Sequence, residues 1–172
     1  MVVFLIGYMG CGKSSLGRRI AARTGYEFID MDKLIEQRYH ASVSEIFATR
    51  GEQWFRDTER RTLEEMAGLT ENTIVATGGG VPCFSDNMRL MNSIGRTVYL
   101  KMSAQKIVGR ISPAGREKRP IIRGMNDEQL LDFIGKNLPQ REPYYESSSI
   151  IIDCDTLGEQ SVMEHIINEI KR

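Results

Sequence analysis

The chain has 172 residues, with 23 Lys and Arg against 23 Asp and Glu, so its formal net charge is zero. This balance argues against a protein held on nucleic acid mainly by electrostatics, although a local site for a small anion remains open. The length is typical of one domain with a buried core. Three cysteines without metal or disulfide spacing indicate a reducing, cytoplasmic setting. Without a signal peptide or the ~20 apolar residues of a membrane span, we expect no membrane partner.

The chain opens with an apolar strand, a glycine-rich loop and a helix. Residues Val2–Ile6 are all apolar, residues 7–14 read GYMGCGKS, and residues 15–23 have an amphipathic helical pattern. The loop fits G-x-x-x-x-G-K-[ST] at every fixed position. Its glycines let backbone N–H groups curl around phosphate oxygens, and the helix start adds further donors. Lys13 would reach the terminal phosphates and Ser14 would ligate Mg²⁺. A glycine turn that binds nothing is the alternative, and the flanking elements argue against it.

Four more short apolar runs predict strands at residues 27–29, 73–76, 97–102 and 149–152, with helical segments between them. Their nearly continuous hydrophobicity is typical of strands covered on both faces, as in a parallel sheet. Five strands separated by helices predict a doubly wound α/β domain. In such domains ligands lie at the carboxyl ends of the strands, so the residues that follow each strand are the candidate site.

Two carboxylates, Asp30 and Asp32, follow the second strand. One residue apart at a strand end, they are expected to point to the same side. One could hold Mg²⁺, directly or through water, and the other could accept hydrogen bonds from a substrate hydroxyl and receive its proton. For Asp32, capping of a helix over residues 33–39 is a purely structural alternative.

A mostly helical region is predicted from residue 42 to residue 68, opened by a capping box at Ser42 and Glu45. Two aromatic residues precede Arg56, and an arginine held rigid by aromatics can form a bidentate pair with a carboxylate or a phosphate. Taken alone, Arg56 is more simply interpreted as a solvated helix charge. The charged residues that follow, beginning with Glu59, are predicted to form an exposed face with i,i+4 pairs.

Three successive glycines follow the third strand, at residues 78–80. They are costly in chain entropy and suggest a backbone that lies flush against a ligand, with a loose loop as the alternative. Residues 111–124 are polar, basic and bounded by Gly and Pro, which predicts a mobile flap rather than a packed element. Such a flap would close over a nucleotide and bring an arginine to the transferring group, whereas a solvated loop without a role is the alternative.

Together these motifs resemble those of the shikimate kinases over essentially the whole chain. The motifs that carry the resemblance are the loop at residues 7–14, Phe28-Ile29-Asp30-Met31-Asp32, Phe55-Arg56, Gly78-Gly79-Gly80, Arg119-Pro120 and Arg141-x-Pro143-x-Tyr145. The loop alone would be unspecific, whereas the set in this order is quite specific.

The resemblance implies a P-loop fold like that of the nucleoside monophosphate kinases, with a five-stranded parallel sheet in the order 2-3-1-4-5 flanked by helices. It implies a single kinase domain over residues 1–172, with a substrate-binding helical region at about 32–62 and a mobile lid at about 111–124. The implied reaction is the ATP-dependent phosphorylation of the 3-hydroxyl of shikimate, in aromatic amino acid biosynthesis, by a cytoplasmic monomer.

The resemblance also implies a role for each site residue. ATP would be bound by Gly10, Cys11, Gly12, Lys13, Ser14, Ser15, Arg110, Arg119 and Gln160. Mg²⁺ would be held by Ser14 and, through its water shell, by Asp30. Shikimate would be bound by Asp32, Arg56, Gly78, Gly79, Gly80 and Arg141. Lys13, Asp32 and Arg119 would be catalytic, with Asp32 as the base and Arg119 on the lid. Relatives often carry an Asn-Pro pair before the last helix, and residues 155–160 lack it, so Gln160 is a weak adenine contact.

Other functions fit parts of the pattern. A kinase for another small acid, such as gluconate, or for a nucleoside monophosphate would share the loop and the fold. A switch protein that slowly hydrolyses GTP would need a base-reading Asn-Lys-x-Asp stretch, which the sequence lacks. A regulatory ATP-binding protein without turnover is the third alternative, and the intact Lys13, Ser14, Asp30 and Asp32 argue against it.

Overall fold

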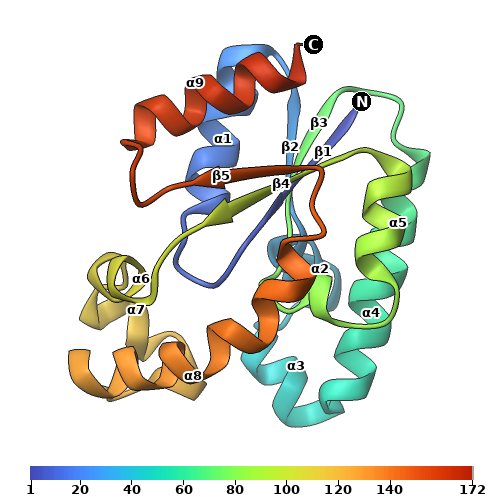
Figure 1. The fold of residues 1–172 in the computed structure, drawn as a ribbon. Coiled ribbons are helices and arrows are strands. Elements are labelled where there is room, and N and C mark those ends of the chain that lie inside the picture. The colour runs from blue at the N-terminus through green and yellow to red at the C-terminus, as the bar shows by residue number, and fades with distance from the viewer. Residues whose placement is uncertain (172) are drawn as a thin grey trace.

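In a computed structural model, which describes residues 1–171, five strands form one parallel sheet in the order β2-β3-β1-β4-β5 (Figure 1). This confirms the expected sheet order. The strands are β1 (Val2–Ile6), β2 (Glu27–Asp30), β3 (Thr73–Ala76), β4 (Arg96–Lys101) and β5 (Ile150–Asp153). Strand β2 is one residue longer than the sequence predicts, whereas β4 begins and ends one residue earlier and β5 one residue later than predicted.

Helices cover both faces of the sheet. Those that the structure describes are α1 (Lys13–Thr24), α2 (Met31–Tyr39), α3 (Val43–Arg50), α4 (Glu52–Glu65), α5 (Asn87–Ile94), α6 (Ala104–Arg110), α7 (Pro113–Glu117), α8 (Asp127–Tyr145) and α9 (Glu159–Ile170). Helices α1 and α9 lie on one face, α4 and α5 lie on the other, and α2, α3, α6, α7 and α8 gather beyond the carboxyl ends of the strands (Figure 1). Within residues 1–171, no helix is long and apolar enough to cross a membrane.

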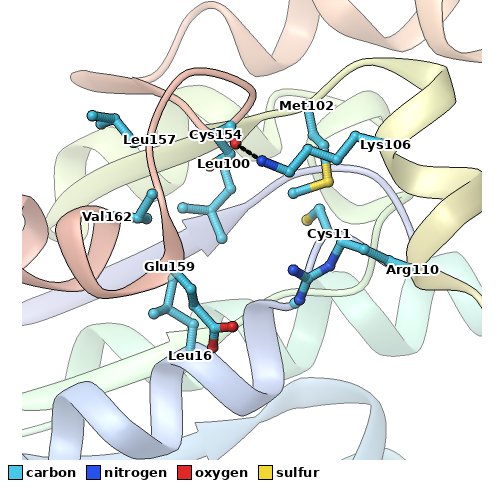
Figure 2. Close-up of a pocket in the computed structure, with 11 residues that line it drawn as sticks. Cys11, Leu16, Leu100, Met102, Lys106, Arg110, Cys154, Leu157, Glu159 and Val162 are labelled. Atoms are coloured by element: carbon cyan, nitrogen blue, oxygen red, sulfur yellow. Dashed lines mark hydrogen bonds between the residues drawn. The ribbon is translucent and has the colours of Figure 1, made fainter.

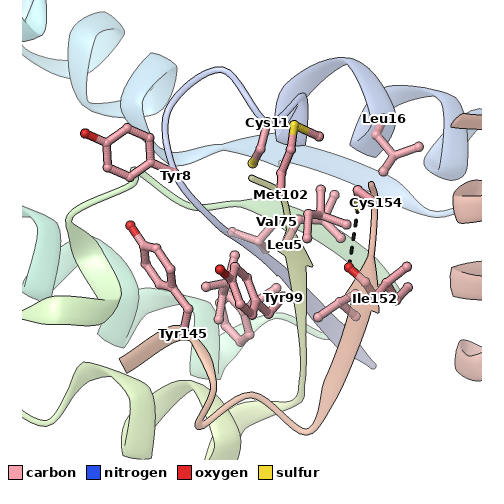
Figure 3. Close-up of a cluster of buried hydrophobic side chains, with 14 of the residues drawn as sticks. Leu5, Tyr8, Cys11, Leu16, Val75, Tyr99, Met102, Tyr145, Ile152 and Cys154 are labelled. Atoms are coloured by element: carbon pink, nitrogen blue, oxygen red, sulfur yellow. Dashed lines mark hydrogen bonds between the residues drawn. The ribbon is translucent and has the colours of Figure 1, made fainter. Parts of the chain in front are cut away.

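The core is centred on β1, whose five residues are all buried. Figure 3 shows part of this cluster, including Leu5 of β1. The expectation of strands covered on both faces holds for β1, β3 and β4. It is wrong for β2 and β5, which are the two edges of the sheet. On β5, an edge strand, Ile151 is 47% exposed although Ile152 is buried. Apolar side chains alone do not distinguish an edge strand from a central one.

Two glycines set the helix boundaries nearest to the candidate site. Gly12 has φ +92°, and α1 begins directly after it at Lys13, two residues earlier than the sequence predicts. Lys13 and Ser14 therefore lie in the first helical turn. Gly51 has φ +82° and divides the predicted helical region into α3 and α4. Only glycine adopts such angles without strain, so the chain turns at these two points. The capping box of Ser42 and Glu45 is confirmed.

The segment 111–124 is more ordered than the expected flap. It contains α7 and a 3₁₀ turn at Pro120–Ile122. Ile111 and Ile122 are buried in the main core, and Arg116 donates hydrogen bonds to the Met125 carbonyl and the Asp127 carboxylate. The expectation that this segment lacks packing is therefore wrong, because two isoleucines in a basic sequence anchor it. Its closing over a nucleotide stays a prediction.

Candidate active site

The segments that follow β1, β2 and β3 meet at one edge of the sheet. These three strands are neighbours, and residues at their carboxyl ends pair in register, with Ala76 opposite both Leu5 and Asp30. A cavity of about 960 Å³ opens at this edge. It is lined by the loop with the start of α1, by the start of α2, by α3, by Gly79 and by residues 118–121. Pockets of this size hold small-molecule substrates and cofactors.

Lys13 is buried within the glycine-rich loop. Its Nζ donates to the carbonyl oxygens of Gly7, at 2.7 Å, and Tyr8, at 3.0 Å, and the residue is 9% exposed. These bonds fix the ammonium beside the N-terminus of α1, where the helix dipole also favours negative charge. The loop thus has the geometry of a phosphate site, as the motif predicts. Gly10, Gly12, Ser14 and Ser15 line the cavity together with Lys13.

Asp30, and not Asp32, caps α2. Its Oδ1 accepts a hydrogen bond from the Lys33 backbone N–H at 3.2 Å, while its Oδ2 accepts one from the Ser14 hydroxyl at 2.5 Å. The capping alternative for Asp32 is therefore wrong. The reason is that β2 passes into α2 without a loop, so the last strand residue becomes the N-cap. Asp32 lies in the first turn of the helix, and both carboxylates still line the cavity.

Asp32 has the electrostatics of a proton acceptor. Burial raises the pKa of its carboxyl above the ordinary value, and the neighbouring Asp30 carboxylate raises it further, while the Lys13 ammonium lowers it. A raised pKa makes the carboxylate a stronger base. Asp32 also lies against the glycine segment, because a Cβ built on Gly78 would be 2.9 Å from its Oδ1.

Arg56 is held rigid beside the glycine segment. Its guanidinium lies 4.0 Å from the centre of the Phe84 ring, and its Nη1 donates to Oε2 of Glu59 at 2.6 Å. Only 15% of its side chain is exposed, so the simpler interpretation as a solvated helix charge is wrong. On α8, the Arg141 guanidinium lies 5.3 Å from the centre of the Tyr8 ring. The two arginines flank the same glycines.

Glu59 is the residue that the sequence interpretation misplaces. It is 2% exposed rather than part of an exposed charged face. Burial raises the pKa of its carboxyl to about 7, although the Arg56 guanidinium lowers it. A signal existed in the sequence, because Phe55, Glu59, Thr62 and Leu63 share one helical face and all are buried. The regular spacing of charges around Glu59 concealed it.

The three glycines form a closely packed wall. The hydroxyl of Tyr145, which is fully buried at the end of α8, donates to the Gly79 carbonyl at 2.6 Å. A Cβ on Gly80 would be 2.5 Å from Nη1 of Arg56. The loose-loop alternative is therefore wrong, because the backbone at these glycines is packed against the side chains of Arg56 and Tyr145. That this backbone lies flush against a ligand stays a prediction.

We expect Gly80→Ala to leave the fold intact and to impair binding at Arg56. The backbone at Gly80 is right-handed helical, at φ −87°, so alanine fits without strain, and its methyl group displaces only the flexible end of Arg56. A misplacement of about 1 Å costs on the order of 10²-fold in activity. Steady-state kinetics should show a raised Michaelis constant for the acid substrate. The matched control is Gly135→Ala on α8, where a methyl group meets no atom within 4 Å. Equal kinetics in the two variants would contradict this role of Gly80.

The other side of the loop faces a smaller cavity of about 30 Å³ (Figure 2). Arg110 lies across it, with Nε donating to the Gly10 carbonyl at 3.2 Å, and Lys106 donates to the Cys154 carbonyl. Glu159 lines this cavity, whereas Gln160 is exposed and bonds to Glu164. The structure thus gives no support to Gln160 as an adenine contact.

The remaining predicted residues lie near the loop. Cys11 is 4% exposed, with Sγ 3.7 Å from Nζ of Lys13, which agrees with its interpretation as a small loop side chain. Arg119 lines the large cavity from the segment 111–124, and its Nη1 donates to the Gly115 carbonyl at 2.7 Å.

The fold and the cavity together define a P-loop kinase of small molecules. The phosphate loop follows the central strand β1, and Asp30 and Asp32 lie at the junction of β2 and α2. The partly buried Arg56 and Arg141 flank the glycine wall. The family model described as shikimate kinase matches residues 9–171. The chain belongs to the shikimate kinase family, as the motifs indicate.

Similar proteins agree with this assignment. The shikimate kinase of Parabacteroides distasonis is 44% identical over 170 residues, which cover 99% of this chain and 97% of that protein. A crystal structure of the shikimate kinase from Bacteroides thetaiotaomicron has a TM-score of 0.88 and 40% identity, covering 99% of this chain and 96% of that one. The shikimate kinase from Acinetobacter baumannii in complex with shikimate has a TM-score of 0.81 and 30% identity, covering 98% and 92%.

The kinases named as alternatives are similar in fold alone. A gluconokinase from Sinorhizobium meliloti has a TM-score of 0.60 with 18% identity and covers 99% of this chain and 91% of its own. A deoxyadenosine kinase from M. mycoides has a TM-score of 0.62 with 17% identity and covers 100% of both chains. The expected likeness in fold to P-loop kinases of small acids and nucleotides is thus confirmed. The family assignment favours shikimate over gluconate as the acceptor.

Proposed function

We propose that the chain transfers the γ-phosphoryl group of ATP to the 3-hydroxyl of shikimate, giving shikimate 3-phosphate and ADP in aromatic amino acid biosynthesis. The observation that carries this proposal is the cavity that joins the phosphate loop to Asp32 and to Gly79 of the glycine wall. The complex of the Acinetobacter baumannii relative with shikimate supports the choice of acceptor.

Shikimate would bind between α2, α4 and α8. Its carboxylate would pair with Arg56 and Arg141, since guanidinium groups recognise carboxylates in a bidentate way. Its hydroxyls would bind to Asp32 and to the backbone of residues 78–80. The two arginines would select an anion, and the hydrogen bonds with Asp32 and the glycine backbone would select hydroxyl groups, so that together they favour an anionic polyol.

Ser14 and Asp30 would hold Mg²⁺ beside the phosphates. A hydroxyl and a carboxylate are the hard oxygen donors that Mg²⁺ prefers. Within residues 1–171, no three His, Cys, Asp or Glu side chains gather closely enough to hold a metal by themselves. The cation would therefore complete its shell with phosphate oxygens and water, as is usual for Mg²⁺ in kinases. When bound, it would neutralise charge on the transferring phosphates.

The transfer itself needs positioning and charge stabilisation. The 3-hydroxyl oxygen of shikimate forms a bond to the γ-phosphorus, and the bond from that phosphorus to the bridging oxygen of ADP breaks. Asp32 accepts the hydroxyl proton. Lys13 stabilises the developing negative charge from the loop, and Arg119 does so from the lid. Gly10, Cys11, Gly12, Ser15 and Arg110 would hold the rest of ATP.

The remaining expectations stay predictions. They are the domain limits of 1–172, the substrate-binding region at about 32–62, the lid at about 111–124, a monomeric state, a cytoplasmic location and the lack of a nucleic-acid partner.

A coupled assay that follows ADP release tests the proposal when shikimate, gluconate and adenosine monophosphate are offered in parallel with Mg²⁺ and ATP. We expect turnover with shikimate that exceeds the other two by at least about 10²-fold, because a site built for one polar substrate leaves buried groups unpaired with another. Equal or faster turnover with gluconate would overturn the choice of acceptor. Binding of ATP without turnover of any acceptor would favour a regulatory protein.

A further inference from the structure

Glu59 is a buried carboxylate that the transfer mechanism does not use. It lies on α4 with 2% of its surface exposed. Its Oε2 accepts a hydrogen bond from Arg56 at 2.6 Å, and its Oε1 faces the glycine wall, since a Cβ on Gly78 would be 3.1 Å away. Glu59 is thus hydrogen-bonded to the same guanidinium that the carboxylate of the acceptor would bind.

Charged and titratable groups face Glu59 from every element packed around it. Arg56 belongs to the same helix, Asp32 projects from α2, Arg141 from α8, and Cys83 from the turn after the glycine wall. The two arginines favour the charged form of Glu59, whereas Asp32 disfavours it. Burial outweighs the arginines and raises the Glu59 pKa to about 7. At neutral pH this carboxyl is therefore close to half protonated.

We propose that Glu59 takes up a proton from solvent when the carboxylate of the acceptor binds at Arg56 and Arg141. This inference rests on the proposed function. An anion that shares the guanidinium of Arg56 brings a second negative charge beside a desolvated carboxylate, and two such charges in a dry site cannot both persist. Protonation removes the repulsion. The neutral acid keeps a carbonyl oxygen that accepts the hydrogen bond from Arg56, so the arginine stays in place.

The sign of the pH effect follows. Anion binding raises the Glu59 pKa further, so the complex holds more protons than the free protein. By linkage, shikimate affinity is greatest at a pH below the Glu59 pKa of the free protein. It falls as the pH rises above that value, and it stops falling once the pH exceeds the Glu59 pKa of the complex. Between those two values the dissociation constant rises by up to about tenfold per pH unit.

Titration calorimetry with shikimate at pH 7 tests the inference when it is run in two buffers without phosphate, PIPES and Tris, that differ in heat of ionisation. The difference in observed heat gives the protons taken up per shikimate, which we expect to be about half a proton. Glu59→Gln, which mimics the neutral acid, should still bind shikimate but should take up close to none. Glu64→Gln is the matched control, because this glutamate is exposed on the same helix and pairs with Arg60. It should keep the uptake of the unaltered chain.

Two results would overturn the inference. If the heat of shikimate binding to the unaltered chain is the same in both buffers, no proton is taken up on binding. Uptake that persists in Glu59→Gln assigns the proton to another group, such as Asp32. If Glu59→Gln does not fold, the dissociation constant of the unaltered chain between pH 6 and pH 9 decides, because a flat profile contradicts the linkage. Lack of any shikimate heat in the unaltered chain would count against the proposed function instead.

Discussion

Lys13→Ala is expected to lower kcat by about 10²–10³-fold, as removal of one preorganised charge typically does. The Lys13 ammonium lies at the N-terminus of α1, fixed by the carbonyls of Gly7 and Tyr8. The ammonium is thus in place before the phosphates bind. Little reorganisation is then needed when negative charge develops on the phosphoryl group in the transition state. Steady-state kinetics with saturating ATP and shikimate measure the effect.

The control for Lys13→Ala is Lys136→Ala, an exposed lysine on α8 that pairs with Asp132. It should leave kcat unchanged. Because Lys13 also bonds to the loop, its replacement could loosen the loop itself. The melting temperature of the variant separates these effects, since a loosened loop lowers it and a missing charge at the phosphates does not. Near-normal turnover in a folded Lys13→Ala variant would remove this residue from the phosphate site.

Arg56→Ala is expected to weaken shikimate by roughly 2–5 kcal/mol, which is about 30-fold to more than 10³-fold in affinity, with a much smaller effect on ATP. The arginine is 15% exposed and bonded to Glu59, so its loss removes a cation for the substrate and leaves a buried carboxylate without that partner. Binding of each substrate, measured separately by calorimetry, gives the two effects.

The control for Arg56→Ala is Arg61→Ala, five residues along the same helix, where the side chain is exposed. It should leave both affinities unchanged. An Arg56→Ala variant that binds shikimate normally would show that this guanidinium does not touch the acceptor. An equal loss of ATP and shikimate binding would indicate general disruption of the site.

Features with a local cause were predictable from the sequence. The capping box at Ser42 and Glu45 depends on residues three apart, and the phosphate loop depends on eight consecutive residues. The five strands follow from short apolar runs. The sheet order came from the resemblance to a family rather than from the strands, because pairing between strands far apart in the chain leaves no local pattern.

Features with a long-range cause were missed. Glu59 is buried because α4 turns it toward Arg141 and Asp32, which come from distant parts of the chain. Ile122 anchors the basic segment only because a core cluster lies beneath it. The sequence places the possible cap of α2 two residues too late, at Asp32 instead of Asp30, because nothing in the two carboxylates shows that β2 passes directly into α2.

The two carboxylate oxygens of Asp30 accept hydrogen bonds from two different helices. Oδ1 closes the N-terminus of α2, and Oδ2 meets the Ser14 hydroxyl at the start of α1. A cation that arrived beside Ser14 would therefore compete for Oδ2 and leave the helix cap at Oδ1 untouched. Loading of the site would exchange one hydrogen bond without moving α2, so the base on its first turn would stay aligned. Cation binding would then cost this fold little structural rearrangement.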